Sequence, residues 1–322
     1  MRGTPRVPRP SMAGWDYMRA RPSDSDRTAP KLQLNDRVPS TRQSPAQVPA
    51  ALRNEIIRGL SLRPRRLPPR LLYDSAGARL FDEITRLPEY YLTRTELSIL
   101  KTCTPELATI MGPRVRVIEP GSGSGAKTEI LLRALEHPAA YVAVDVTRGA
   151  LRDLSDRLRR LHPTLDVTPI QADYSRPFDL VSPATNAERT IVFFPGSSIE
   201  NFTSREAIDF LRHMAGLVGQ DGGMILGADL TKDRATIEAA YNDSAGVTAR
   251  FNLNVLKHVN RLLSGDFVEG EPIITEYSHK YSPEALDALI AAGSWVTRRE
   301  WLDDRSWFSV RFLESRSDHT ST

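Results

Sequence analysis

Between residues 115 and 228, short apolar runs alternate with stretches of helical spacing, and this alternation limits the possible folds more than any other feature of the chain. The apolar runs expected to form strands are Val115–Glu119, Ala140–Val144, Asp166–Gln171, Thr190–Phe194 and Met224–Ala228. The helices expected between them are Ala126–Glu136, Thr147–Leu161 and Ser204–Leu217. Strands that alternate with helices of about 10–15 residues predict an α/β fold, in which a parallel sheet carries helices on both faces.

Regular apolar spacing continues on either side of this region. Before it, we expect helices from about residue 50 to 60, from about Ala78, and over Arg94–Thr102, with a break at Pro88. After it, the expected helices are Lys232–Tyr241, Val247–Leu263 and Pro283–Ala292. The expected strands there are Ile273–Tyr281, Val296–Trp301 and Trp307–Phe312.

The positive charge of the chain is concentrated in residues 1–49. The formal net charge is +3, and this segment holds nine basic and four acidic residues, so the remainder is net negative. Eight of the 23 prolines also lie in it, which predicts a disordered tail. A nucleic-acid-binding protein is expected to carry positive charge on its folded body, so we expect no nucleic-acid partner.

Composition also bears on the compartment and the assembly. No apolar stretch approaches the roughly 20 residues of a membrane-spanning helix, and no apolar signal segment follows Met1. Cys103 is the only cysteine, so it forms no intrachain disulfide. We therefore expect a cytoplasmic protein without a membrane partner. Because no coiled-coil heptads are present, we expect a monomer.

A glycine-rich loop follows the first expected strand, where residues 119–128 read EPGSGSGAKT. Ala126 stands where a phosphate-binding P-loop needs glycine before Lys127, so a P-loop is disfavoured. The spacing of Gly121, Gly123 and Ala126 matches a dinucleotide-binding loop only in its relaxed form. The loop alone leaves dinucleotide enzymes and methyltransferases open.

Acidic residues at the ends of the next two strands narrow the choice. Asp145 ends the second strand, where a carboxylate accepts hydrogen bonds from ribose hydroxyls. Asp173 and Tyr174 follow the third strand, where an acid and a neighbouring aromatic ring suit the amino group and the face of adenine. These features favour an S-adenosyl-L-methionine site over an NAD site or a sheet without a ligand.

The fourth strand leads into Gly196–Asn201, at the sheet edge where open α/β sheets place their ligands. The amide of Asn201 both donates and accepts hydrogen bonds, which suits the ammonium and carboxylate of an amino acid. An asparagine just before an expected helix is also suited to cap that helix, and the residues alone leave both readings open.

With these motifs together, the chain resembles the histidine-specific N-alpha-methyltransferases of ergothioneine biosynthesis over most of residues 50–315. The matching motifs are Leu72–Tyr91, the glycine loop, Gly196–Asn201, Ala239–Asp243 and Thr275–Ser278. The resemblance implies that the α-amine of L-histidine receives three methyl groups from S-adenosyl-L-methionine, which gives hercynine. It also implies a Rossmann-like class I methyltransferase sheet with a smaller α+β substrate domain.

Carried over residue by residue, the resemblance assigns two sets of side chains. The cofactor set is Gly121, Ser122, Gly123, Lys127, Asp145, Asp173 and Tyr174. The substrate set is Tyr73, Tyr90, Asn201, Tyr241, Glu276 and Ser278. Methyl transfer from a sulfonium needs positioning and exclusion of water, with no metal or nucleophile, so we expect Asn201, Tyr73 and Tyr241 to position the substrate.

Composition, apolar spacing and the resemblance together give five successive ranges. These are a tail (1–49), a helical substrate-side segment (50–112), the cofactor domain (113–231), a shortened lid region (232–282), and a C-terminal helix with strands that complete the sheet and a disordered end (283–322). Glu276 and Ser278 lie two apart on an expected strand and so share one face. Over this face, an imidazole ring can donate to Glu276 and pair its other nitrogen with Ser278.

Two departures from the family are visible. Glu200 stands where members commonly have glycine, which places an extra carboxylate near the substrate amine. In addition, only Val268–Pro272 separates the segment ending at Phe267 from the strand of Glu276, where the family has a few dozen further residues. We expect a complete cofactor domain with a reduced lid and weakened, altered or absent histidine turnover. The alternatives are methylation of another amino acid or amine, such as a tryptophan derivative, and a catalytically silent relative.

Overall fold

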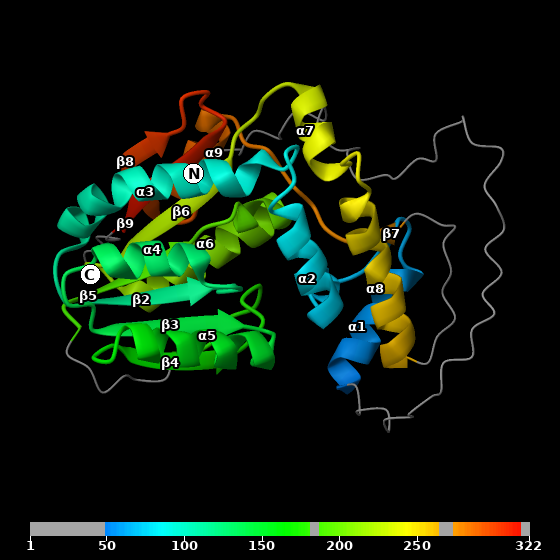
Figure 1. Ribbon diagram of the computed structural model, residues 1–322, viewed down its shortest axis with the longest axis horizontal. Coiled ribbons are helices and arrows are strands. Elements are labelled where there is room, and N and C mark those ends of the chain that lie inside the picture. The colour runs from blue at the N-terminus through cyan, green and yellow to red at the C-terminus, as the bar shows by residue number, and fades with distance from the viewer. Residues whose placement is uncertain (1–48, 181–186, 264–272, 317–322) are drawn as a thin grey trace, which may run out of the picture. The chain divides into compact units, whose positions relative to one another are not determined.

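The computed structural model describes residues 49–180, 187–263 and 273–316 (Figure 1). These residues form two compact units. The larger unit comprises the described residues of 83–244 and 277–316, and the smaller unit comprises those of 49–82 and 245–276. Each unit joins segments that are distant in the sequence, whereas the five predicted ranges are successive and remain predictions. The predicted tail lies outside the described residues except for Pro49.

The larger unit is built on a seven-stranded sheet of order β4-β3-β2-β5-β6-β9-β8. Its strands are β2 (Val115–Pro120), β3 (Ala140–Asp145), β4 (Asp166–Gln171), β5 (Arg189–Phe194), β6 (Gly223–Asp229), β8 (Trp295–Leu302) and β9 (Phe308–Ser315). The first five pair in parallel, as predicted, and the two C-terminal strands add antiparallel pairs at the β6 edge. The sheet is therefore mixed.

Helices cover both faces of this sheet (Figure 1). On one face lie α3 (Tyr91–Met111), α4 (Ala126–Ala134) and α5 (Arg148–Leu161), and on the other lie α6 (Ser204–Val218) and α9 (Pro283–Ala292). The inner side of α6 presents Ala207, Phe210, Leu211 and Met214 at helical spacing to strands β2, β3, β5 and β6. Burial of these apolar side chains supplies the main stabilisation of this face.

The smaller unit contains α1 (Ala50–Ser61), β1 (Arg65–Arg66), η2 (Pro69–Leu72), most of α2 (Ser75–Ile84), α8 (Val247–Leu263) and β7 (Ile273–Ile274). Helix α8 packs on η2, and His258 Nδ1 lies 2.8 Å from the carbonyl oxygen of Leu71. Helix α2 begins at Ser75, three residues before the predicted Ala78, because Asp74 Oδ1 accepts a 2.8 Å hydrogen bond from the Gly77 amide at its first turn.

The strand predicted over Ile273–Tyr281 is wrong for most of its length. Strand β7 comprises only Ile273–Ile274, and it pairs with the equally short β1. Beyond it, Tyr281 forms an isolated bridge with Leu230, and the His279 amide donates to the carbonyl of Glu200. Because a two-residue partner cannot template a nine-residue strand, Glu276 and Ser278 do not share a strand face.

The other boundaries agree within a few residues, apart from α3, which is longer at both ends than predicted and contains Pro105. Helix α7 (Arg234–Tyr241) starts two residues after the predicted Lys232. Across the described ranges, every helix is too short or too polar to pass through a membrane.

Candidate active site

The glycine loop joins β2 to α4 with a backbone that only glycine adopts readily. Gly121, Gly123 and Gly125 have φ of 75°, 49° and 71°. A Cβ on Gly121 would lie 3.0 Å from Cε1 of Tyr174. Gly121 and Gly123 are exposed, whereas the Ser122 side chain is buried. The loop therefore presents bare backbone at the carboxyl end of the sheet, next to a helix N-terminus.

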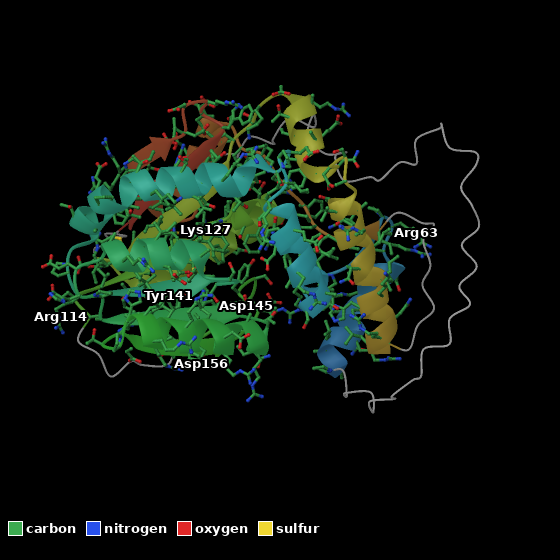
Figure 2. All side chains as sticks on the ribbon, in the orientation of Figure 1. Arg63, Arg114, Lys127, Tyr141, Asp145 and Asp156 are labelled. Carbon is green, nitrogen blue, oxygen red and sulfur yellow. The ribbon has the colours of Figure 1, made fainter. Side chains whose placement is uncertain are left out.

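Asp145 lies against this loop, as predicted from the strand order. Its Oδ2 accepts a 3.3 Å hydrogen bond from the Gly123 amide, and its Oδ1 accepts a 2.8 Å hydrogen bond from the Thr147 amide. The carboxylate is half-buried and has further lone pairs, so it can still accept hydrogen bonds from hydroxyl groups. Figure 2 shows Asp145 and Lys127 in the larger unit.

Asp173 and Tyr174 lie beyond the end of β4. Asp173 Oδ1 accepts hydrogen bonds from the Ser175 amide and hydroxyl at 3.1 and 2.6 Å. The Tyr174 ring stands next to Gly121 and meets the rings of Phe194 and Phe202 edge to face, at 5.7 and 6.3 Å between centroids. The ring is thus fixed by aromatic packing beside the loop.

Lys127 is paired with an acid that the sequence analysis did not identify. Its Nζ lies 2.5 Å from Oε2 of Glu96, a side chain of α3 that is 1% exposed. Oε1 of Glu96 also accepts a 2.8 Å hydrogen bond from the Gly196 amide. One carboxylate therefore connects α3, the first turn of α4 and the loop after β5. The signal in the sequence was a charged residue on an otherwise apolar side of a helix.

Asn201 ends the short helix η3 (Ser198–Asn201) after β5. The turn before it contains Gly196 and Ser197, both with positive φ. Helix α6 is capped instead by Thr203, in a capping box with Glu206. Asn201 is therefore not the cap of α6, so the alternative reading of Asn201 as a helix cap is wrong.

Three of the predicted substrate residues come together in the larger unit. The rings of Tyr90 and Tyr241 meet edge to face with centroids 6.0 Å apart. The Tyr241 hydroxyl lies 2.8 Å from Oγ of Ser278. Tyr90 precedes α3, Tyr241 ends α7, and Ser278 lies in the segment before α9, so the fold joins residues up to 188 positions apart.

The remaining predicted substrate pair lies in the smaller unit. The hydroxyl of Tyr73 is 3.4 Å from Oε1 of Glu276, although 203 positions separate them. The Tyr73 ring packs edge to face with Phe81 and Phe251, at 5.7 and 5.5 Å between centroids. The sequence motifs that contain Tyr73 and Glu276 thus converge within one compact unit.

A group of buried charges beside Ser278 was also missed by the sequence analysis, except for Glu200. Its members besides Glu200 are Asp229, Lys232 and Lys280. Asp229 is the last residue of β6, and Lys280 lies two positions beyond Ser278. A signal was available, because Asp229 ends an apolar strand at the ligand-binding edge of the sheet and Lys232 lies three positions later.

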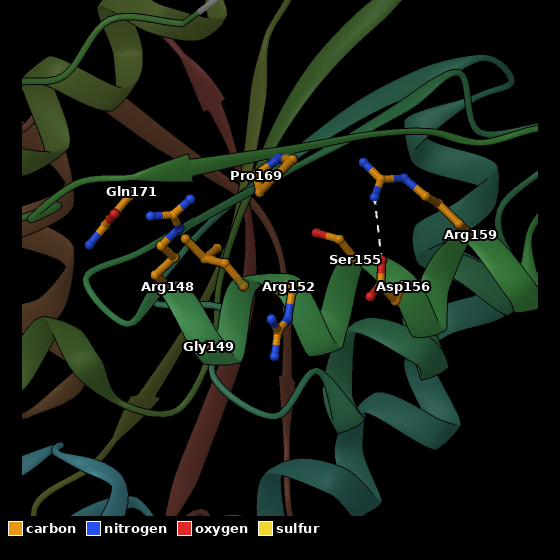
Figure 3. Close-up of a pocket in the computed structure, with 9 residues that line it drawn as sticks. Arg148, Gly149, Arg152, Ser155, Asp156, Arg159, Pro169 and Gln171 are labelled. Carbon is orange, nitrogen blue, oxygen red and sulfur yellow. Dashed lines mark ion pairs between the residues drawn. The ribbon is translucent and has the colours of Figure 1, made fainter.

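Figure 3 shows a separate pocket over α5 and β4. Its volume is about 550 Å³, and its lining includes Arg148, Arg152 and Arg159, the last of which pairs with Asp156 at 3.7 Å. No predicted cofactor or substrate residue lines this pocket. It is therefore not the candidate active site.

Comparison with known sequences identifies the family of the chain that carries these site residues. The profile of the family described as histidine-specific, SAM-dependent methyltransferase matches residues 52–269 and 265–315. The chain belongs to this family. It is thus an S-adenosylmethionine-dependent N-methyltransferase with the class I α/β fold.

Individual proteins of known name or structure are similar to this chain. The histidine N-alpha-methyltransferase of Mycolicibacterium smegmatis is 39% identical over 304 residues, covering 81% of this chain and 94% of the relative. An N-methyltransferase of Aspergillus fumigatus is 29% identical over 218 residues, covering 66% of this chain and 58% of the relative. A solved magnesium protoporphyrin IX methyltransferase of Synechocystis with bound SAH aligns with a TM-score of 0.46 at 15% identity, covering 77% of this chain and 98% of that one.

Proposed function

We propose that the protein transfers methyl groups from S-adenosyl-L-methionine to the α-amine of L-histidine, giving the trimethylated betaine hercynine. The observation that carries this proposal is that the profile of a histidine-specific family matches residues 52–269 and 265–315. The second range includes Glu276 and Ser278. The contacts of Tyr73 with Glu276 and of Tyr241 with Ser278 support it, because they join residues that the sequence analysis assigned to the substrate.

The residues at the carboxyl end of the sheet fit the cofactor. The exposed backbone at Gly121 and Gly123 leaves room for a ligand that a Cβ would obstruct, and Asp145 beside it offers a carboxylate to ribose hydroxyls. Tyr174 offers an aromatic ring next to the loop. When bound there, S-adenosylmethionine supplies a methyl group on a positively charged sulfur. The chain's own residues supply no covalent chemistry in this proposal.

The substrate residues act by positioning. Asn201 accepts a hydrogen bond from the amine and donates one to the carboxylate of the amino acid, which orients the amine. Tyr90 and Tyr241 present aromatic surface and a hydroxyl beside Ser278 and help to exclude water. In the smaller unit, Tyr73 lies 3.4 Å from Glu276, whose carboxylate suits a ring N–H donor.

Two findings favour a second candidate, in which the substrate is another amine or turnover is weak. The alignment with the M. smegmatis relative is 304 residues long but covers 81% of a 322-residue chain, so it contains long gaps in this chain. The two parts of the family match meet at residues 265–269, next to the place where the sequence analysis locates the missing residues. Residues 264–272 lie outside the described part of the structure.

Mass spectrometry of the products separates these candidates. The purified protein is incubated with S-adenosylmethionine and, in turn, histidine, methylated histidines, tryptophan and other amino acids. Histidine carrying one, two and three added methyl groups is the expected result. Methylation of a different amine would favour the second candidate. No methylation by protein that binds S-adenosylhomocysteine would mean that the chain is a silent relative.

A variant of Glu276 tests the substrate assignment. A hydrogen bond to a charged group contributes about 1.5–3 kcal/mol, so Glu276→Gln is expected to lower kcat/KM for histidine about tenfold or more. Glu136→Gln, a change of an exposed residue after α4, serves as the control. Equal kcat/KM values for the two variants would contradict the role of Glu276.

A further inference from the structure

Glu200 lies at the centre of a buried hydrogen-bonded cluster within the larger unit. We call it the Glu200 cluster, and its members are Ser197, Glu200, Asp229, Lys232, Tyr241, Ser278 and Lys280. The Glu200 carboxylate is 1% exposed. Its Oε1 accepts hydrogen bonds from the Ser197 hydroxyl and from the Asp229 amide, the latter at 2.6 Å. The carboxylate is therefore fixed by its own turn and by the end of β6.

The charged members of the Glu200 cluster are two lysines and two carboxyl groups, and burial raises the pKa of Glu200 to about 7 although Lys280 opposes the shift. Lys280 Nζ lies between two carboxylates, 2.6 Å from Glu200 Oε2 and 2.9 Å from Asp229 Oδ2. Lys232 pairs with the other Asp229 oxygen at 2.6 Å. Burial alone would lower the pKa of Lys280, but the carboxylates of Glu200 and Asp229 raise it well above its ordinary value. Lys280 therefore stays protonated and acts only as a hydrogen-bond donor.

Inside this cluster, the Ser278 hydroxyl has no hydrogen-bonding capacity left. A serine hydroxyl has one hydrogen and two lone pairs. Its hydrogen goes to Glu200 Oε2, 3.2 Å away, and one lone pair accepts from Lys280 Nζ at 2.8 Å. The Tyr241 hydroxyl lies 2.8 Å away, and either oxygen of this pair can donate. Because the Tyr241 oxygen already accepts from Lys280 at 2.9 Å, we assign the Tyr241 hydrogen to the second lone pair of Ser278.

The full occupancy of the Ser278 hydroxyl affects which substrate rings it can bind. A neutral imidazole has one N–H donor and one acceptor nitrogen, whereas an indole has a donor and no acceptor. The proposed role of Ser278 toward imidazole requires its hydroxyl hydrogen to reach the acceptor nitrogen. In this chain that hydrogen is held by Glu200.

We propose that Glu200 is a specificity-determining residue, which withdraws the Ser278 hydroxyl from the substrate and so relaxes the preference for a ring with an acceptor nitrogen. The inference rests on the proposed function, because it takes Ser278 to face the substrate side chain. It deepens that proposal by naming the substrate class. The enzyme accepts aromatic amino acids with or without a ring acceptor, and histidine holds little advantage over tryptophan.

Four proteins test this inference: the wild type, Ser278→Ala, Glu200→Gly and the double variant. Binding of histidine and of tryptophan is measured by calorimetry in the presence of S-adenosylhomocysteine, and kcat/KM is measured wherever methyl transfer occurs. The readout is the ratio of histidine to tryptophan in each protein. Binding of S-adenosylhomocysteine alone reports whether each variant is folded.

Ser278→Ala is expected to leave the ratio within about twofold of the wild type, because its hydroxyl is already occupied. Glu200→Gly is expected to raise the ratio about tenfold, the effect of one recovered hydrogen bond. The double variant should return to the wild-type ratio. The double variant lacks the Glu200 carboxylate, as Glu200→Gly does, but it also lacks the Ser278 hydroxyl. A return to the wild-type ratio would therefore show that the rise in Glu200→Gly comes from the freed Ser278 hydroxyl and not from the loss of charge.

Two results would overturn the inference. One is a tenfold fall in the ratio for Ser278→Ala alone, and this single variant decides the question if Glu200→Gly does not fold. The other is an unchanged ratio, or no binding of either amino acid, in a Glu200→Gly protein that still binds S-adenosylhomocysteine. Failure of the proposed function looks different, because the wild type would then transfer no methyl group to histidine while the binding ratios could still be compared.

Discussion

The hydroxyl of Tyr141, in β3 next to the edge strand β4, donates a 2.5 Å hydrogen bond to the carboxyl group of Glu119. The same oxygen, Oε2, accepts a second hydrogen bond from the Thr128 hydroxyl of α4. Glu119 is 2% exposed and lies directly before the glycine loop. A buried carboxyl group thus links β3, β2 and α4 at the base of the proposed cofactor site.

This buried carboxyl predicts a pH dependence of stability. Burial raises the pKa of Glu119 to about 7 from its ordinary 4.5, although the hydrogen bonds from Thr128 and Tyr141 oppose the shift. The folded protein therefore keeps a proton that the unfolded chain releases above about pH 4.5. The stabilisation is fully present below about pH 4.5 and is lost as the pH rises through about 7.

Glu119→Gln should remove this dependence. We expect the Tm of the variant to rise relative to that of the wild type between about pH 5 and pH 8. Thermal unfolding followed by circular dichroism measures both proteins, with Glu136→Gln as an exposed control. Parallel curves for Glu119→Gln and the wild type would show that Glu119 titrates normally.

Gly121 allows a second prediction, because its left-handed backbone and its contact with Tyr174 both oppose a side chain. Gly121→Ala is expected to lower the free energy of unfolding by about 1–2 kcal/mol and to weaken binding of S-adenosylhomocysteine. Gly149→Ala in α5 is the matched control, since a Cβ there meets nothing within 4 Å. Titration calorimetry and urea unfolding give the two quantities, and equal results for the two variants would refute the prediction.

Much of the sheet could be predicted from the sequence, because each strand of the parallel part is a short apolar run bounded by turn residues. The position of Asp145 beside the glycine loop follows as well, since the carboxyl ends of neighbouring parallel strands meet at one edge. The family resemblance added the substrate residues, which periodicity alone does not distinguish from packed aromatic or solvated polar residues.

The segment after β7 shows where such prediction stops. Alternation around Glu276 and Ser278 is typical of a strand, but a strand needs a partner of matching length, and β1 is two residues long. The sequence also could not predict that Glu96 pairs with Lys127 or that every hydrogen-bonding position of the Ser278 hydroxyl is occupied. Both depend on contacts between residues more than 30 positions apart, which local patterns do not encode.

The pair of Lys127 and Glu96 gives a third prediction. Removing one partner leaves a buried charge, which costs about 3–5 kcal/mol when both groups are fully buried. Because the Lys127 side chain is 20% exposed, we expect Lys127→Met to cost about 2 kcal/mol of unfolding free energy. The double variant Glu96→Gln/Lys127→Met should recover more than half of this loss in urea unfolding. A double variant as unstable as the single one would show that the unpaired Glu96 carboxylate is not the source of the loss.

Asn201 and Thr203 separate a substrate role from a structural one within three positions of the chain. Thr203 caps α6, so Thr203→Ala should cost about 1 kcal/mol of stability and leave kcat/KM for histidine unchanged. Asn201 does not cap the helix, so Asn201→Ala should lower kcat/KM at least about tenfold with a smaller loss of stability, because it removes the group proposed to orient the amine. Steady-state kinetics and urea unfolding on both variants provide the comparison. The opposite pattern, a destabilised Asn201→Ala protein with full activity, would assign Asn201 to the architecture of the turn and leave the orientation of the amine to other residues.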